Sequence, residues 1–280
     1  MLVIEKKNKL RNKLIQAKTI GKTIGFVPTM GALHSGHLSL IERAKKECDV
    51  VVCSIYVNPT QFNNAADFEN YPQTLKADVN LLDLAKCDFV FTPTFDELYE
   101  SKSDLLDIDL GNLERNMEGE YRPGHFLGMV TVVKKFFDIV EPDKGFFGEK
   151  DFQQLAIINY MVSFFQLPIE IIGCATVREN DGLALSSRNA LLNKEQREAA
   201  PLIYKALCSL KELLLTHTVQ ECKDMVTEQI NKNKELGVEY IEIVNSKTLQ
   251  PITEYNTQKV CRACIAVYAG NIRLIDNIAL

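Results

Sequence analysis

Two histidines three residues apart, His34 and His37, are the strongest chemical signal in this sequence. They lie in a glycine-containing segment, Pro28–His37, that follows a short apolar stretch and opens a stretch with helical spacing. The first turn of a helix presents unpaired backbone N–H groups and the positive end of the helix dipole, which favour phosphate. Two imidazoles on one turn could stabilise charge that grows at phosphorus. Because two of only four histidines fall in this turn, we predict a phosphate site rather than solvated surface histidines.

A second polar segment, Asn58–Phe62, follows the most apolar stretch of the chain, Val50–Val57. Ligands of open α/β sheets bind beyond the carboxyl ends of the strands. The amide of Gln61 can donate to a carboxylate and accept from a hydroxyl, which suits a hydroxy acid. Position alone leaves a plain proline-containing loop equally open.

The segment Phe147–Gln154 again joins an expected strand to an expected helix. Gly148 allows close approach of a ligand, and Lys150 supplies a mobile positive charge suited to phosphate. Asp151 could simply cap the helix. Gln154 lies about one helical turn further on and could face the same cleft.

Two more segments combine cationic and polar groups. Asp181–Asn189 supplies two hydroxyls and a guanidinium, from Ser186, Ser187 and Arg188. This is a phosphate-binding set that could close over a nucleotide as a lid, although a polar linker is the alternative. Arg122 and His125 precede an expected helix and could line an anionic site or merely belong to a capped loop.

The elements that must position these segments alternate between strand and helix before Val177. Strands are expected at Thr23–Val27, Val50–Val57, Asp88–Phe91, Gly145–Phe147 and Ile169–Cys174, and helices at Leu38–Glu47, Thr74–Ala85, Phe126–Val140 and Phe152–Phe165. Such alternation predicts an α/β fold with a Rossmann-like, doubly wound parallel sheet.

The pattern changes near residue 176. A polar loop is expected first, and then two helices and three strands, at Val177–Asn189, Lys194–Leu215, Val219–Leu236, Val238–Val244, Lys259–Ala269 and Ile272–Ile275. Pro201 is expected either in the first turns of the first helix or at a break in it. We therefore predict two domains, a Rossmann-like nucleotide-binding domain at 1–176 and a smaller α+β domain at 177–280 that serves as a lid.

Composition excludes several other classes of protein. The 280 residues are 46% hydrophobic and 25% charged, as in globular proteins. A net charge of −5 argues against broad binding to nucleic acid, and the longest apolar stretch is too short to span a bilayer. Cys261 and Cys264 have CxxC spacing, but a strand would direct the two thiols to opposite faces, so no metal role is expected for them. Scattered cysteines without a secretory segment predict a cytoplasmic protein.

Familiar nucleotide motifs are missing, since the sequence has neither a Walker A segment nor a GxGxxG after the first expected strand. The segments instead resemble the pantothenate synthetase (pantoate–β-alanine ligase) family. The matching segments are Val27–His37, Val57–Phe62, Arg122–His125, Phe147–Gln154, Asp181–Asn189 and Arg273–Asn277. Each alone is a modest signal, but all six occur in the family's order over nearly the whole chain.

The resemblance implies a carbon–nitrogen ligase of pantothenate and coenzyme A biosynthesis. ATP and pantoate would give pantoyl-adenylate and pyrophosphate, and the amine of β-alanine would then displace AMP to form pantothenate. Members of the family use Mg²⁺ and are usually homodimers. No nucleic-acid or membrane partner is implied.

The resemblance also assigns roles residue by residue. The ATP site would comprise Met30, Gly31, Ala32, Leu33, His34, Ser35, Gly36, His37, Gly148, Glu149, Lys150, Asp151, Val177, Leu185, Ser186, Ser187 and Arg188. Of these, His37, His34, Lys150 and Arg188 would be catalytic. Gln61 and Gln154 would hold pantoate, with Gln61 also within reach of β-alanine, and Asp78 would assist with Mg²⁺.

Two positions depart from the family's pattern, because Gln73 and Leu127 stand where relatives commonly carry arginine. Both remove positive charge, which we expect to affect affinity or loop packing rather than the reaction. Three alternatives stay open at this point: a nucleotidyltransferase of the same fold, an RNA-binding relative of aminoacyl-tRNA synthetases, and a non-catalytic binding protein. Release of AMP only when an amine is added would separate the first alternative from a ligase.

Overall fold

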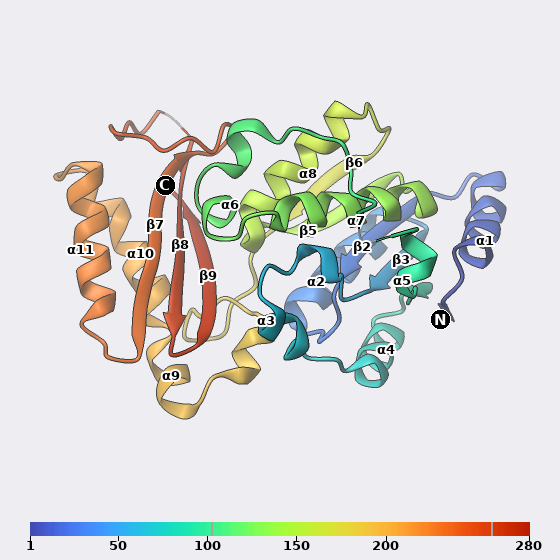
Figure 1. The fold of residues 1–280 in the computed structure, drawn as a ribbon, viewed down its shortest axis with the longest axis horizontal. Helices are drawn as coiled ribbons and strands as arrows, with labels where there is room; N and C mark the ends of the chain where they lie inside the picture. The colour runs from blue at the N-terminus through green and yellow to red at the C-terminus, as the bar shows by residue number, and fades with distance from the viewer. Residues whose placement is uncertain (102, 259) are drawn as a thin grey trace. The chain divides into compact units, whose positions relative to one another are not determined.

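The computed structural model describes residues 1–101, 103–258 and 260–280, without the side chain of Ala66, and divides into two compact units (Figure 1). Unit 1 comprises residues 1–110, 122–149 and 154–175, and unit 2 comprises residues 111–121, 150–153 and 176–280. The segments 111–121 and 150–153 therefore belong with unit 2, although they lie far before residue 176 in the sequence.

Unit 1 is built on a six-stranded parallel sheet in the order β1-β4-β3-β2-β5-β6. The strands are β1 (Leu2–Ile4), β2 (Ile24–Thr29), β3 (Val50–Ile55), β4 (Phe89–Phe91), β5 (Lys144–Gly148) and β6 (Glu170–Cys174). The predicted doubly wound sheet is confirmed, and the short edge strand β1 is an addition to it. The strand order reverses between β2 and β5, and such a switch point is where open α/β sheets bind their ligands.

Helices cover both faces of this sheet. They are α1 (Lys7–Thr19), α2 (Ser35–Glu47), α3 (Ala65–Glu69), α4 (Leu75–Leu84), α5 (Phe95–Leu98), α7 (His125–Val140) and α8 (Phe152–Phe164), whose first residues belong to unit 2. Successive side chains of β2 point toward opposite faces of the sheet. Val27 lies in a buried cluster with Ile41 of α2, whereas the ring of Phe26 lies 5.7 Å from that of Phe136 of α7.

Unit 2 is built on a three-stranded antiparallel sheet in the order β7-β8-β9. Its strands are β7 (Leu236–Asn245), β8 (Cys261–Ala269) and β9 (Ile272–Ala279), and its helices are α6 (Glu118–Tyr121), α9 (Lys194–Ala199), α10 (Leu202–Leu213) and α11 (Val219–Asn231), with 3₁₀ turns η2 (Gly111–Glu114) and η4 (Ser187–Leu191). The expected helix Lys194–Leu215 is broken, since α9 ends before Pro201 and α10 begins after it. Lys259, the expected start of the second strand, lies outside the described residues.

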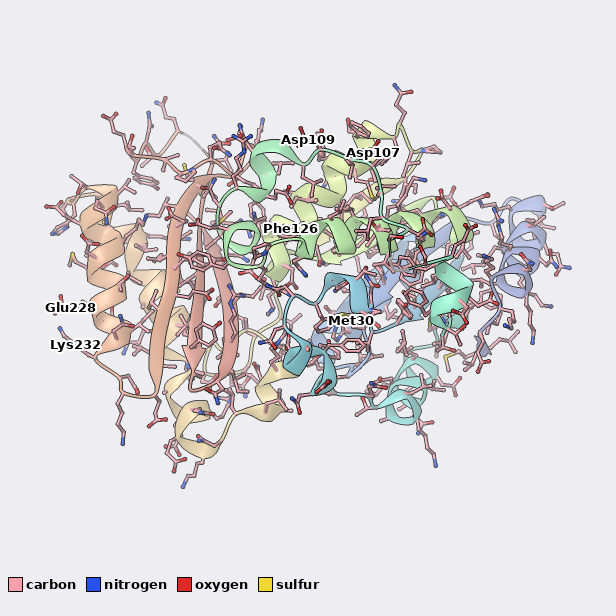
Figure 2. All side chains as sticks on the ribbon, in the orientation of Figure 1. Met30, Asp107, Asp109, Phe126, Glu228 and Lys232 are labelled. Carbon is pink, nitrogen blue, oxygen red and sulfur yellow. The ribbon has the colours of Figure 1, made fainter. Side chains whose placement is uncertain are left out.

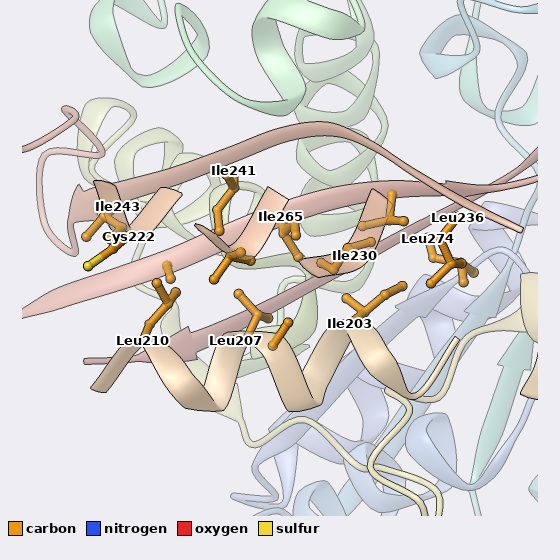
Figure 3. Packing of buried hydrophobic residues seen from close by; sticks show 14 of the residues in the cluster. Ile203, Leu207, Leu210, Cys222, Ile230, Leu236, Ile241, Ile243, Ile265 and Leu274 are labelled. Carbon is orange, nitrogen blue, oxygen red and sulfur yellow. The ribbon is translucent and has the colours of Figure 1, made fainter. Parts of the chain in front are cut away.

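The two faces of this sheet differ in chemistry. One face packs on α10 and α11 through aliphatic side chains such as Leu207 and Ile265, which Figure 3 shows meeting between helix and strands. The opposite face carries Tyr240, Arg262, Arg273 and Asn277. Several polar groups of this face bond to the segments 111–121 and 150–153: for example, the Tyr240 hydroxyl donates to Glu118 at 2.9 Å. This polar covering explains why two remote segments pack with unit 2.

The fold also shows where the two cysteines of the CxxC segment lie. Cys261 belongs to the apolar cluster beneath α10 and α11, while Cys264 pairs with Asn277 on the polar face, so the thiols lie on opposite faces as predicted. Among the described residues, no group of three or more His, Cys, Asp or Glu side chains could hold a metal ion. No described helix combines the length and apolar character that crossing a membrane requires.

Candidate functional site

The loop between β2 and α2 is held in an unusual backbone conformation by a buried carboxylate. Gly31 and Ala32 both have positive φ, 81° and 49°, a region that a non-glycine residue rarely adopts. The side chain of Asp78, only 1% exposed, accepts from the N–H groups of Ala32 at 3.0 Å and Leu33 at 2.8 Å. The hydroxyl of Thr74 donates to the same carboxylate. Such over-determined strain is typical of functional loops.

The side chains of His34 and His37 cap the first turn of helix α2. His34 is the N-cap residue, and its Nδ1 accepts from the N–H of Gly36 at 3.1 Å. In return, Nδ1 of His37 accepts from the N–H of His34 at 3.3 Å. The two ring centroids are 4.1 Å apart. This is a capping box built from two histidines in place of the usual hydroxyl or carboxylate residues.

The cap fixes the tautomer of both rings. A backbone N–H can only donate, so each Nδ1 must keep its lone pair and the hydrogen of the neutral ring must sit on Nε2. Protonation of Nδ1 would place a second hydrogen against that backbone N–H. In its neutral form each ring therefore carries its hydrogen on Nε2, and such an N–H is one kind of donor from which a phosphate oxygen can accept.

Gln61 follows β3 in the 3₁₀ turn η1 (Pro59–Gln61) and is tied to the histidine loop. Its side chain is 7% exposed. Its Oε1 accepts from Asn58 at 3.2 Å, and its Nε2 lies 3.1 Å from the sulfur of Met30, which is labelled in Figure 2. The structure thus brings together the first two predicted segments within unit 1.

The backbone around Gln61 is fixed by the first turns of α7. Nδ1–H of His125 donates to the carbonyl of Gln61 at 2.8 Å, and the ring is 7% exposed. A Cβ at Gly128 would lie 2.2 Å from the carbonyl oxygen of Thr60, so only glycine permits this approach. His125, expected either to line an anionic site or to belong to a capped loop, instead points into the protein and supports Gln61.

Asn58 was missed as a functional residue, although it anchors the whole turn. It is 1% exposed, donates to Gln61 and to the carbonyl of Gly128 at 3.2 Å, and accepts from the hydroxyl of Tyr99 at 3.1 Å. Burial raises the pKa of Tyr99, which keeps this hydroxyl protonated as the donor. The Asn-Pro pair was the available signal, since asparagine favours turns that its own side chain closes.

The predicted residues after β5 fall on both sides of the division between units. Gly148 ends β5 in unit 1, and a Cβ there would meet no atom within 4 Å, so packing of the protein does not require glycine. Lys150 belongs to unit 2, with a side chain 18% exposed and 3.8 Å from the carboxylate of Asp151.

Two adjacent glutamines of α8 have different surroundings. Gln154, the predicted pantoate ligand, is half-buried in unit 1. Gln153 is 5% exposed and packs within unit 2. Its side chain accepts from the N–H of Glu118 at 2.9 Å and donates to the carbonyl of Leu113 at 2.8 Å.

In unit 2, the predicted ATP-binding residues Val177 and Leu185–Arg188 lie in a hairpin and in the short turn that follows it. The N–H of Leu185 donates to the carbonyl of Val177 at 3.0 Å, so these two predicted residues lie opposite each other. Ser186 then caps the 3₁₀ turn η4 by accepting from the N–H of Arg188 at 3.3 Å. Val177, Leu185 and the set Ser186–Arg188 are therefore gathered by local hydrogen bonds.

One arginine joins this hairpin to β9. The guanidinium of Arg178 donates to both carboxylate oxygens of Asp276, at 2.6 and 2.8 Å, and to the carbonyl of Gly182 at 3.1 Å. It also lies over the ring of Tyr204, 3.6 Å from the centroid. Neither Arg178 nor Asp276 was predicted as functional. Asp276 falls in a segment that the family resemblance had marked, Arg273–Asn277, without assigning it a role.

Comparisons with known sequences match this chain to one family. The family model described as pantoate-beta-alanine ligase matches residues 2–279. A pantothenate synthetase of Porphyromonas gingivalis is 50% identical over 96% of this chain and 95% of its own, and one of Christiangramia forsetii is 47% identical over 100% and 99%.

Solved structures agree with these sequence relatives. The crystal structure of pantothenate synthetase from Thermus thermophilus superposes with a TM-score of 0.91 at 40% identity, over 99% of both chains. The pantoate-beta-alanine ligase of Francisella tularensis, complexed with beta-gamma ATP and beta-alanine, gives 0.83 at 35% identity, over 99% of this chain and 97% of that one.

Proposed function

Because this chain belongs to the pantoate–β-alanine ligase family, we propose that it joins pantoate to β-alanine with ATP, through a pantoyl-adenylate intermediate. The products are pantothenate, AMP and pyrophosphate. The observation that supports the adenylate route best is the histidine capping box at the switch point of the sheet. It supplies oriented N–H donors at a helix N-terminus, where a phosphate binds.

In the first half-reaction, a carboxylate oxygen of pantoate attacks the α-phosphorus of ATP and pyrophosphate leaves. Negative charge grows on the α-phosphate oxygens in the transition state. We assign Nε2–H of His37 as a donor to these oxygens and His34 as its partner in the same turn. Donors fixed before the reaction need no reorganisation, and each contributes roughly 3–4 kcal/mol.

We propose that groups of unit 2 neutralise the remaining negative charge on the phosphates. Lys150 and Arg188 are proposed to neutralise phosphate oxygens, with the hydroxyls of Ser186 and Ser187 as additional donors. The loop Met30–Gly36, Gly148, Glu149, Asp151, Val177 and Leu185 complete the proposed nucleotide contacts. No covalent enzyme intermediate is required.

Gln61 and Gln154 are proposed to hold pantoate, whose hydroxyls and carboxylate match the two-sided hydrogen bonding of an amide. Gln61 is also proposed to meet β-alanine. In the second half-reaction the β-alanine nitrogen attacks the acyl carbon, the C–O bond to AMP breaks, and AMP leaves with both electrons of that bond.

Asp78 does not fit a role as a Mg²⁺ ligand. Its two carboxylate oxygens already accept from the backbone of Ala32 and Leu33 and from the hydroxyl of Thr74, and it is 1% exposed. We propose instead that Asp78 fixes the histidine loop. Mg²⁺ would arrive with the ATP phosphates, as it commonly does, and we assign no step to a metal held by the protein.

A cytoplasmic location and a homodimer are also proposed from family membership. Sedimentation velocity of the purified chain over a range of concentrations tests the dimer directly.

The function is tested by measuring pyrophosphate release from ATP with a panel of hydroxy acids, first without and then with β-alanine. The proposal expects pantoate to support about one equivalent of pyrophosphate per site alone, and steady turnover with AMP once β-alanine is added. A product that retains the nucleotide after amine is added would favour a nucleotidyltransferase. No pantoate-dependent pyrophosphate release would overturn the proposal.

A further inference from the structure

The segment Arg273–Asn277 on β9 bonds to three parts of unit 2, two of which hold or lead to proposed phosphate-binding groups. Arg273 donates to Glu118 at 2.8 Å and thereby ties down the segment 111–121. Asp276 holds the hairpin through Arg178. Asn277 reaches the third segment, 150–153, which contains Lys150.

Asn277 is bonded to the backbone of Lys150 itself. Its Nδ2 donates to the Lys150 carbonyl at 2.8 Å, and the side chain is 5% exposed. Residues 150 and 277 are separated by 127 positions in the sequence, so this contact is specific to the fold. It fixes the peptide plane from which the lysine side chain projects.

The orientation of the Asn277 amide is determined by its two neighbours. Nη1 of Arg262 lies 2.5 Å from Asn277 Oδ1, and a guanidinium can only donate, whereas the Lys150 carbonyl can only accept. The amide therefore cannot flip. Arg262 is itself held over the ring of Phe152, 4.1 Å from its centroid, on the same segment as Lys150.

The same end of β9 also holds the hairpin that contains Arg178. The carbonyl of Asn277 accepts from Arg178 at 3.3 Å, and its N–H donates to Asp276 at 2.7 Å. Consecutive residues of one strand thus anchor Lys150 on one face of the sheet and the hairpin that leads to Ser186–Arg188 on the other. A rigid strand is a better support for a reactive constellation than a loop.

We propose that Asn277 is a positioning residue that acts through Lys150, holding the ammonium group where the phosphates of ATP require it. The proposal rests on the proposed function, since it concerns the same nucleotide site. Misplacement of a reacting or charge-stabilising group by about 1 Å can cost on the order of 100-fold in rate. We therefore expect Asn277→Ala to lower kcat for pyrophosphate release about 10- to 100-fold, with a much smaller change in KM for pantoate.

The test is a double-mutant cycle on single-turnover pyrophosphate release, using wild type, Asn277→Ala, Lys150→Ala and the double variant. If Asn277 acts through Lys150, its substitution has almost no further effect once Lys150 is alanine. An equal fold-loss in both backgrounds would mean a general structural role and would overturn the inference. Should Lys150→Ala fall below detection, the same cycle is run on Lys150→Arg.

Three controls separate the possible failures. Asn277→Asp keeps the acceptor for Arg262 but sets a carboxylate oxygen against the Lys150 carbonyl, so it should lose rate with the Arg262 contact retained, and urea denaturation reports whether it is folded. Asn271→Ala makes the same chemical change at an exposed position of the β8–β9 turn and should keep wild-type rate. If wild type itself releases no pyrophosphate with pantoate, the proposed function fails, whatever the variants do.

Discussion

The two units hold their predicted phosphate-binding groups in different ways. In unit 1, His34 and His37 hold each other across three positions, and Asp78 reaches the same loop from 45 positions away. In unit 2, Lys150 and the hairpin are held by β9, across 127 and 98 positions. The histidine cap of unit 1 forms with its own helix, whereas the Asp78 contact requires α4 to be in place. The arrangement in unit 2 exists only after the sheet of unit 2 has formed, so its geometry depends on the whole unit.

The largest expected effects come from removing one proposed phosphate donor of each unit. His37→Ala and Lys150→Ala should each lower kcat by about 100-fold or more, roughly 3 kcal/mol, because each removes one preorganised donor. Thermal unfolding should stay close to that of wild type. Exposed residues of the same types, His217 and Lys211, provide matched controls, and their alanine variants should keep full activity. Near-normal turnover of either test variant would contradict the role proposed for the residue that it replaces.

A second comparison concerns the two buried carboxylates that anchor these segments, Asp78 in unit 1 and Asp276 in unit 2. Asp78→Asn places an amide N–H₂ against at least one backbone N–H, and Asp276→Asn weakens the paired bonds from Arg178. Each should cost about 1–3 kcal/mol of unfolding free energy, measured by urea denaturation. The Asp78→Asn loss should be the same with and without Mg²⁺, since Asp78 is proposed to fix the loop. Recovery of stability or rate at high Mg²⁺ would instead support a metal ligand.

The smallest expected effects are changes in the labelling rates of two buried thiols, one in each unit, which report the opening of each unit separately. Burial raises the pKa of Cys87 in unit 1 and of Cys264 in unit 2, each to about 12. At pH 8 the thiolate fraction of either group would be on the order of 1 in 10,000, so labelling should require opening of the unit. The half-buried Cys208 should react first.

Peptide mass spectrometry after thiol labelling would follow these sites individually. Asp276→Asn should accelerate labelling of Cys264 and leave Cys87 unchanged, because the lost anchor belongs to unit 2. Equal acceleration of both thiols would show that the two units open together and would remove the contrast between them.

Sequence patterns predicted unit 1 well because its signals are local. Apolar strands, helical spacing and turn residues sit next to one another, and the histidine turn, the Asn58–Phe62 turn and the order of elements all follow from them. The break at Pro201 was foreseen as one of two alternatives, since proline lacks the N–H that a continuous helix needs.

The remaining features depend on contacts that sequence spacing does not encode. Nothing near Glu118 or Lys150 indicates that these residues cover a sheet formed more than 100 positions later. The buried role of Asp78 was likewise invisible, because a carboxylate in a helix is usually solvated. The roles of the individual site residues, and of 177–280 as a lid, stay predictions.

The central claim, activation of pantoate as an acyl-adenylate, is tested most directly by oxygen transfer. Pantoate labelled with ¹⁸O in its carboxylate is turned over with ATP and β-alanine, and the nucleotide product is analysed by mass spectrometry. Our account predicts one ¹⁸O in each AMP released, because a carboxylate oxygen becomes the bridge to phosphorus and leaves with it. Unlabelled AMP, or labelled inorganic phosphate together with ADP, would contradict it.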